Sequence, residues 1–324
     1  IGAIPGKRES RRFIGPHVLT QQDVQEARVH EDEVAFGGWA IDLHPPGGID
    51  AVDEPPFTPH HVENVYGIPL RCYYSRNVEN LFFAGRNISA THVAFASTRV
   101  MATCAVGGEA VGFAAAHCVK ERNDSPQKLV EDSRQLRRLQ ETMLNADVTL
   151  VSKKPEKAGD LIGFATVTSG VNLSGFDIER VKDGATRDKV DPKTGELIEP
   201  HGWRSTPINA ASPASITFTW PKPVKMSELH LWFDTGFTRE LVLSPADGPY
   251  RRKPETRVIR GPQPETVKDY EIVINGDVAF RISGNYQRKV VHRFERPADV
   301  QTLTLHVHAT NGVPEARVFE VRAF

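Results

Sequence analysis

The stretch of residues 80–112 constrains the fold most, because it joins an apolar run, a Gly-Arg turn and a segment rich in small residues. Residues 81–84 form a continuous apolar run that Gly85 ends, which predicts a strand covered on both faces. Ser97 or Thr98 offers a hydroxyl cap for a helix that runs to about Lys120. The stretch therefore predicts an α/β layer in which a helix follows a buried strand.

Small side chains recur at every fourth position along this predicted helix. They are Cys104, Gly108, Gly112 and Ala116. Positions four apart lie on the same face of a helix, so this face lets another backbone approach closely. Glycine in a helix interior costs roughly 1 kcal/mol relative to alanine. Close packing on a sheet or on a flat ligand is expected to compensate this cost.

Composition bounds the classes of function. The 324 residues carry 40 Lys plus Arg against 41 Asp plus Glu, for a formal charge of -1, so no global field favours nucleic acid. Arg99, Glu109 and His117 interrupt the small-residue segment, and no apolar run reaches the ~20 residues of a spanning helix, so we expect no membrane span. The 3 cysteines are an odd number without C-x-x-C spacing, which argues against a disulfide framework and a structural zinc site.

The chain changes character twice. An amphipathic helix is predicted over residues 125–145, with one apolar stripe of Leu129, Leu136, Leu139 and Met143. A charged, Pro- and Gly-containing linker follows over residues 152–160. From about residue 161 apolar and polar side chains alternate with period two, which marks strands with one buried face. The apolar sets are Ile216, Phe218 and Trp220, then Leu229, Leu231 and Phe233, and then Leu303, Leu305 and Val307.

Turn residues separate at least seven such runs. A hairpin is predicted around Asn275 and Gly276, because an Asn-Gly pair fits the tight turn between two strands. So many short strands predict an antiparallel β-sandwich. The segments TFTWPKPVKMSELHLWFDT and VHATNGVPEARVFEVRAF resemble the discoidin-type, galactose-binding-like jelly roll, whereas residues 161–213 match it only loosely.

Several ordered motifs of the first half resemble a known family. They are RESRR at residues 8–12, GWAIDLHPPGG at residues 38–48 and IPLRCYYSRNVENLFFAGRNISATHVAF at residues 68–95. Together they are similar to the C-terminal, flavin-contacting part of FAD-dependent oxidoreductases of the glutathione-reductase-like superfamily, over roughly residues 1–150. The resemblance implies FAD as the cofactor.

The chain also departs from that family. Such enzymes open with a strand and a G-x-G-x-x-G turn that holds the pyrophosphate, and no G-x-G-x-x-G occurs in these 324 residues. We therefore expect a C-terminal portion of a flavoenzyme, whose N-terminal FAD-binding half belongs to the same precursor or is a separate subunit. The expected fold class is an α/β flavin-domain portion, an incomplete Rossmann-type FAD fold, plus an all-β jelly-roll sandwich. The expected division is residues 1–120 for the flavin domain, 121–160 for the amphipathic helix and linker, and 161–324 for the sandwich.

The resemblance also implies which residues approach the cofactor. Arg86 and Asn87 would reach the pyrophosphate or ribityl chain, and Gly85 would allow close backbone approach. The turn that contains Ser97, Thr98, Arg99, Val100 and Met101 would face the pyrimidine edge of the flavin, since a helix N-terminus carries partial positive charge and free N–H donors. The alternative from composition alone is an ordinary helix packed on a sheet, with Arg86 in a salt bridge.

Three residues are candidates for catalysis. His92 suits the role of a base beside the flavin, because the histidine pKa lies nearest neutrality, although a lone His in an apolar context is often structural. Arg8 and Arg11 could clamp a carboxylate or a sugar acid, or form a solvated surface. The expected reaction is hydride transfer to the flavin from a small polar substrate, with a carbohydrate-related molecule as one option. The alternative is a noncatalytic carbohydrate-binding or interaction module attached to a flavoenzyme remnant.

Other polar positions carry weaker hypotheses. His60 and His61 with Glu63 have no third ligand at helical spacing, so we expect no metal there. Trp232 lies opposite the apolar stripe of its strand, where it either stacks on a sugar ring or, as we favour, packs on the flavin domain. The acidic loops around Asp183 and Asp188 are either calcium sites or ordinary turns.

Overall fold

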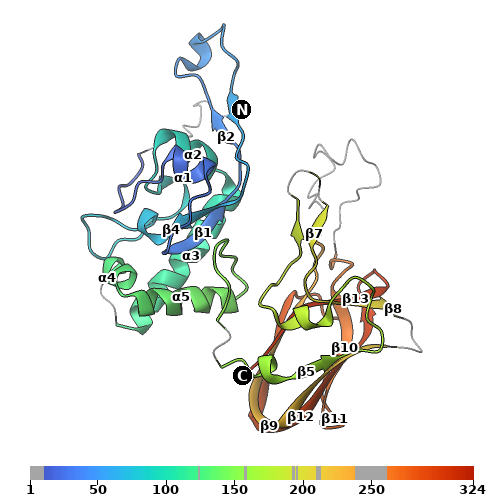
Figure 1. Cartoon of the computed structure of the whole chain (residues 1–324). Helices are drawn as coiled ribbons and strands as arrows, with labels where there is room; N and C mark the ends of the chain where they lie inside the picture. The colour runs from blue at the N-terminus through green and yellow to red at the C-terminus, as the bar shows by residue number, and fades with distance from the viewer. Residues whose placement is uncertain are drawn as a thin grey trace. The chain divides into compact units, whose positions relative to one another are not determined.

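The chain folds into two compact units, Ile1–Pro155 and Glu156–Phe324 (Figure 1). The computed structural model describes residues 11–122, 125–156, 159–191, 194, 196–208, 213–237 and 261–324. The expected two-part fold class is confirmed, since a mixed helix and strand unit precedes an antiparallel all-β unit. The expected division at residues 120 and 160 stays a prediction.

The first unit combines five α-helices with two small antiparallel sheets among its described residues. Its strands are β1 (Glu33–Gly37), β2 (Ile41–Leu43), β3 (Thr58–His60) and β4 (Tyr66–Pro69), and β1 pairs with β4 while β2 pairs with β3. Its helices are α1 (Gln21–Gln25), α2 (His92–Thr98), α3 (Met101–Lys120), α4 (Pro126–Glu131) and α5 (Ser133–Asn145). Short 3-10 turns cover Gly48–Asp50, Leu70–Cys72 and Gly85–Asn87.

The buried strand expected over residues 81–84 does not form. Only one isolated bridge, between Tyr74 and Phe82, occurs there. Phe83 is buried, but Leu81 is 42% exposed, so the run is covered on one side only. An apolar run of four residues is too short to distinguish a strand from a loop that anchors one aromatic side chain, and here the loop prevails.

The helix expected to start at Ser97 or Thr98 is two helices. α2 begins at His92, where the Thr91 hydroxyl accepts a hydrogen bond from the Ala94 amide at 3.3 Å. Ser97 and Thr98 close α2, and α3 starts at Met101 after Val100, whose side chain cannot cap. The capping prediction was therefore wrong, because the capping hydroxyl belongs to Thr91, before His92, and not to Ser97 or Thr98.

The expected close-packed stripe of α3 was also wrong, because a neighbouring face of the helix is the buried one. Nothing lies within 4 Å of a side-chain carbon built on Gly108 or Gly112, and Ala116 is exposed. At Gly107 such a carbon would lie 2.6 Å from the Tyr73 hydroxyl oxygen. The buried face of α3 comprises Thr103, Gly107, Ala110, Ala114, His117 and Cys118. Gly107 is thus the glycine that close packing requires.

The amphipathic stripe over residues 125–145 is confirmed. Leu129, Leu136, Leu139 and Met143 are all buried. The helix breaks at Asp132, whose carboxylate caps α5 by accepting from the Arg134 amide at 2.9 Å. The buried Gln140 amide then donates to the Glu31 and Glu33 carbonyls, at 2.8 and 3.0 Å, which ties α5 to the start of β1.

α3 is also relevant to the expectation that the chain has no membrane span. Within the part of the chain that the structure describes, it is the one helix long and apolar enough to cross a membrane by length and composition. Core helices pass the same test. The expectation therefore stays a prediction.

The second unit is built on one antiparallel sheet with the strand order β11-β10-β12-β9-β13-β8, and β5 also pairs with β9. The strands are β5 (Thr166–Thr168), β8 (Trp203–Pro207), β9 (Ala214–Phe233), β10 (Val267–Ile274), β11 (Asp277–Ile282), β12 (Lys289–Thr310) and β13 (Glu315–Ala323). β6 (Lys189–Val190) and β7 (Leu197–Glu199) form a separate small hairpin.

The long strands β9 and β12 run side by side (Figure 1). Each is long enough to belong to both layers of the sandwich, so the single sheet folds over on itself. The first part of β9 pairs with β5 and its last part with β13. Irregularities in the β9–β12 register lie between Arg293 and Ala298 and between Val300 and Thr302. Bulges of this kind bend a strand from one sheet into the other. The three apolar sets expected on the buried face are all in the core between the layers.

The Asn275-Gly276 hairpin is confirmed. Ile274 pairs with Asp277 across it, which leaves a two-residue turn. Both turn residues have positive φ, 52° and 96°, as the mirror-image turn of a tight hairpin requires.

Trp232 is fully buried, so it offers no exposed face to a sugar ring. The Arg322 guanidinium lies 4.6 Å and the Lys289 ammonium 4.8 Å from the ring centroid. These cations belong to the same unit. The favoured expectation, packing on the flavin domain, is therefore not needed to explain how this tryptophan is covered.

The acidic loops bind protein groups rather than presenting open carboxylates. The Asp183 carboxylate lies 2.6 Å from Nδ1 of His201, and Asp188 accepts from the His201 amide at 2.7 Å. Asp188 also forms an ion pair with Arg204. The calcium alternative is not supported at these two carboxylates, because their oxygens already have donors.

A buried histidine in the sandwich makes the stability of the unit depend on pH. His292 Nε2 lies 3.1 Å from the Tyr270 hydroxyl, and the Phe280 ring centroid lies 4.7 Å away. Burial lowers the pKa of His292 from 6.5 to about 4. Below pH 6.5 the folded state therefore holds fewer protons than the unfolded chain, and stability falls as the pH falls from 6.5 towards 4. Solvent screening reduces the full linkage energy, and we expect a loss of about 1–2 kcal/mol.

The measurement is denaturant unfolding from pH 7 to pH 4, followed by tryptophan fluorescence. His292→Gln should remove this part of the pH dependence. His308→Gln is the matched control, because the His308 side chain is 42% exposed. If the free energy of unfolding falls equally with pH in the wild type and in His292→Gln, the assignment to His292 is contradicted.

Candidate functional site

A cavity of about 680 Å³ opens on the first unit between the end of β2, the loop that follows it, and α2. We call it the Arg99 pocket. Its volume is in the range of small-molecule and cofactor sites. The lining residues are Asp42, Leu43, His44, Pro45, Pro46, Gly48, His92, Phe95, Ala96 and Arg99. The lining thus combines an apolar surface with a few ionisable groups.

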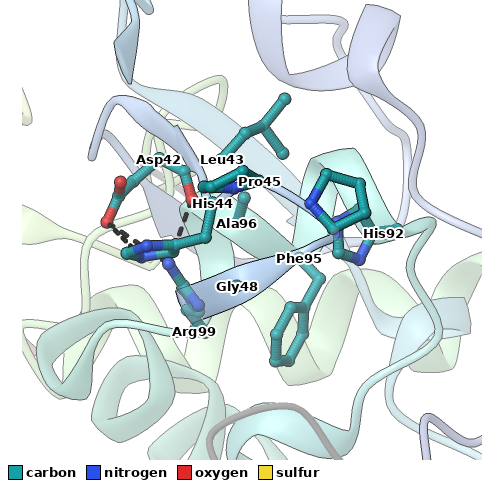
Figure 2. Close-up of a pocket in the computed structure, with 10 residues that line it drawn as sticks. Asp42, Leu43, His44, Pro45, Gly48, His92, Phe95, Ala96 and Arg99 are labelled. Carbon is teal, nitrogen blue, oxygen red and sulfur yellow. Dashed lines mark hydrogen bonds and ion pairs between the residues drawn. The ribbon is translucent and has the colours of Figure 1, made fainter. Parts of the chain in front are cut away.

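Local structure explains how these side chains converge. Asp42 and Leu43 are in β2, opposite Pro59 and Thr58 of β3, and the proline- and glycine-rich loop between these strands carries His44. On α2, the helical spacing of His92, Phe95, Ala96 and Arg99 places their side chains on one face. Figure 2 shows Asp42 and His44 beside Arg99, with His92 and Phe95 farther from this group.

Three polar side chains form a network at one end of the pocket (Figure 2). Nη2 of Arg99 donates to the Asp42 carbonyl at 3.0 Å and to its carboxylate Oδ2 at 3.2 Å. His44 lies on the same carboxylate oxygen, with Nε2 at 3.6 Å, while its Nδ1 lies 2.9 Å from the Pro56 carbonyl oxygen. The other carboxylate oxygen, Oδ1 of Asp42, is buried and has no hydrogen-bond partner among the described residues.

The rear of α2 is fixed by a hydrogen-bonded chain. The Ser97 hydroxyl donates to the Trp39 carbonyl at 2.6 Å, so it accepts from the Tyr66 hydroxyl, also at 2.6 Å. Burial raises the pKa of Tyr66 to about 12, which keeps it protonated as the donor. This chain holds α2 against β4 and so sets the position of Arg99.

A second cavity of about 390 Å³, the Arg11 pocket, is lined by Arg11, Arg12, Phe13, Ile14, Val18, Ser89 and Ala90. Its Arg12 connects it to the first pocket, because the Arg12 guanidinium carbon lies 5.5 Å from the Phe95 ring centroid. The guanidinium carbon of Arg99 lies 6.0 Å from the same centroid. Phe95 therefore contacts an arginine from each pocket.

The structure separates the residues expected to be catalytic. His92 lines the Arg99 pocket and Arg11 lines the Arg11 pocket. Arg8 lies outside the described residues.

The residues expected to bind the cofactor are also dispersed. Arg99 lines a pocket, whereas Val100 and Met101 line neither pocket, and Met101 is 89% exposed. Ser97 and Thr98 are buried at the end of α2. Gly85, Arg86 and Asn87 form a 3-10 turn that lines neither pocket.

Asp42, His44 and Phe95 were not singled out from the sequence. Asp42 and His44 belong to the motif at residues 38–48, where a carboxylate and an imidazole flank a strand end just before a proline pair. That signal was present, because polar groups at strand ends followed by loops commonly carry function. Phe95 had no such signal, since an aromatic residue in a helix is usually part of the core.

Comparison with known proteins shows that the first unit is similar to one family. Residues 1–143 match the model of the family described as FAD dependent oxidoreductase. No curated protein is significantly similar to the chain.

Solved structures similar to the chain include several carbohydrate-binding modules. The family 32 module of C. perfringens NanJ, solved with galactose, is 12% identical with a TM-score of 0.34, over 51% of this chain and 96% of that chain. The family 32 module of Streptococcus pneumoniae EndoD is 17% identical with a TM-score of 0.34, over 51% and 99%. Chitosan-binding module 1 from Paenibacillus sp. IK-5 is 12% identical with a TM-score of 0.33, over 51% and 98%.

Proposed function

We propose, from the match of residues 1–143 to the FAD dependent oxidoreductase family, that the first unit binds the isoalloxazine ring of FAD in the Arg99 pocket. The unit then acts as part of a flavin oxidoreductase that oxidises a small polar substrate. When bound, the flavin supplies the hydride acceptor. The protein binds and orients the flavin and places charged side chains beside it.

The observation that carries this proposal is a largely buried guanidinium at one end of an apolar cavity large enough for the ring. The pyrimidine edge of a flavin presents carbonyl acceptors and one N–H donor. Arg99 supplies guanidinium donors for these carbonyls, from a side chain that is 14% exposed. Leu43, Pro45 and Phe95 offer the flat apolar walls.

Each polar side chain then has a distinct role. Arg99 stabilises the negative charge that develops on the pyrimidine edge during reduction. His92 is the proposed base for the substrate proton, because it lines the same cavity and histidine is the side chain that most often serves as a general base. Arg11 of the neighbouring pocket is proposed to hold an anionic group of the substrate, and Arg8 is proposed to assist it.

The pyrophosphate of FAD requires a further site. Because the sequence has no G-x-G-x-x-G motif, we propose that a dinucleotide-binding half outside these 324 residues supplies it, in the same precursor or as a separate subunit. Gly85, Arg86 and Asn87 are proposed to approach the pyrophosphate or the ribityl chain from this side, and Ser97, Thr98, Val100 and Met101 to adjoin the ring. The proposal for the ring does not depend on that half, since the Arg99 pocket belongs to this unit alone.

The noncatalytic carbohydrate-binding alternative is not favoured. A solvent-facing Trp232 would have supported it, and this side chain is fully buried.

Titration of the full chain with riboflavin and with FAD, followed by flavin fluorescence, tests the proposed function. We expect saturable quenching for both ligands, since riboflavin carries the ring without the pyrophosphate. Ala96→Leu should abolish it, because Ala96 lines the pocket. Ala116→Leu adds the same side chain at an exposed position of α3 and should leave binding unchanged. Quenching that survives Ala96→Leu would exclude this pocket as the flavin site.

A further inference from the structure

Two histidines and an aspartate converge around the short helix α1, apart from the residues that line either pocket. His17 precedes the helix, Asp23 lies within it, and His30 follows it. One ligand atom from each of these three side chains lies within 4.8 Å of the others. Both histidines lie close to one carboxylate, and their ring centroids are 5.2 Å apart.

The backbone holds these groups in place independently of any ligand. The Thr20 hydroxyl and the Asp23 carboxylate form a reciprocal capping box at the start of α1. The His17 amide donates to the Arg71 carbonyl at 3.4 Å, and the Glu33 amide donates to the His30 carbonyl at 3.3 Å. These hydrogen bonds therefore fix the backbone positions of the three residues.

Hydrogen bonds within the protein supply partners for the side chains of Asp23 and His17, but not for Nε2 of His30. Oδ2 of Asp23 accepts from the Thr20 amide at 2.8 Å and lies 3.3 Å from Nε2 of His17. His30 is 8% exposed, and its Nε2 is buried without a hydrogen-bond partner among the described residues. A buried polar atom without a partner is costly, so an imidazole in this position points to a group that the protein itself does not supply.

The geometry is near that of a tetrahedral metal site. Bonds of about 2.0–2.1 Å from zinc to nitrogen or oxygen place neighbouring ligand atoms roughly 3.3 Å apart. The His17 and Asp23 atoms already have a separation of 3.3 Å. The ligand atom of His30 lies no more than 4.8 Å from the other two.

We propose that His17, Asp23 and His30 bind a divalent transition-metal ion of the zinc type. Two imidazole nitrogens and one carboxylate oxygen suit such an ion better than magnesium or calcium, which prefer oxygen ligands. Three protein ligands leave a fourth position for water. The Arg28 guanidinium, 3.6 Å from the other Asp23 oxygen, offsets the carboxylate charge and orients it. The ion ties together the two chain segments that flank α1.

Zinc titration of the tag-free full chain after chelator treatment tests this site. We expect about one Zn²⁺ per chain and an upward shift of the unfolding temperature of the first unit. His17→Ala and His30→Ala should each weaken binding by more than about 100-fold, since even outer-shell changes cost 10–100-fold. His60→Ala removes an exposed histidine and should leave the affinity unchanged.

Co²⁺ loaded into the wild-type chain gives a readout that does not depend on any variant folding. The expected spectrum has the intense visible bands of a four-coordinate ion with nitrogen and oxygen ligands. Weak bands of an octahedral ion, no bound metal in the wild type, or zinc affinity that both histidine variants retain would each overturn the proposal.

Discussion

Arg99→Ala is expected to weaken FAD binding at least about 30-fold, the equivalent of roughly 2 kcal/mol. The Arg99 side chain is only 14% exposed and neutralises Asp42 at 3.2 Å. Its removal leaves a half-buried carboxylate beside the ring edge that becomes negative on reduction. The reduced flavin should therefore lose more affinity than the oxidised flavin, and the midpoint potential of the bound flavin should fall. Fluorescence titration and a potentiometric titration measure the two effects.

Two variants separate this effect from a general loss of charge. Arg134→Ala removes an arginine whose side chain is 91% exposed on α5 and should leave FAD binding unchanged. Arg99→Ala combined with Asp42→Ala should recover part of the lost affinity, because the unpaired carboxylate is gone. Arg99→Ala binding that equals the wild type would remove Arg99 from the flavin site.

Gly202→Ala is expected to destabilise the sandwich by about 2–5 kcal/mol. Gly202 precedes β8 and has a φ of 70°, which costs an L-residue roughly 1–2 kcal/mol. An added side-chain carbon would also meet backbone atoms of β13, the Val318 carbonyl oxygen and, at 2.6 Å, the Phe319 Cα. Backbone in a paired strand cannot move aside easily, so overpacking adds about 1–3 kcal/mol.

Gly284→Ala is the matched control for the backbone contribution. Gly284 has nearly the same φ, 72°, and nothing lies within 4 Å of the added carbon. It should therefore cost only about 1–2 kcal/mol. Denaturant unfolding by tryptophan fluorescence measures both, because Trp203, Trp220 and Trp232 belong to the second unit. Equal losses of unfolding free energy in the two variants would show that the contact with β13 does not contribute to the effect of Gly202→Ala.

The sandwich could be predicted from sequence because its signals are local. Alternation in Ile216, Phe218 and Trp220 follows directly from the pleat of a strand, and Asn275-Gly276 fits one type of turn. Trp232 was harder, because period-two alternation assigns it to the outer face. Only the three-dimensional structure shows that Arg322 and Lys289 cover it there.

The site was only partly predictable for a related reason. His92 and Arg99 were singled out and do line one pocket, but Asp42, the partner of Arg99, is 57 residues away in sequence and meets it only through tertiary packing. The helix start was misplaced because Ser97 and Thr98 are as suitable for capping as Thr91. The Ser97 hydroxyl instead forms hydrogen bonds with the Tyr66 hydroxyl and the Trp39 carbonyl. No local sequence pattern reveals these partners.

Photolabelling of the full chain with an azido-flavin, followed by peptide mapping, tests the central claim most directly. If the Arg99 pocket binds the isoalloxazine ring, the label should attach to peptides that contain residues 42–48 and 92–99, and excess FAD should protect them. Labelling that maps elsewhere, or that excess FAD does not reduce, would contradict the account.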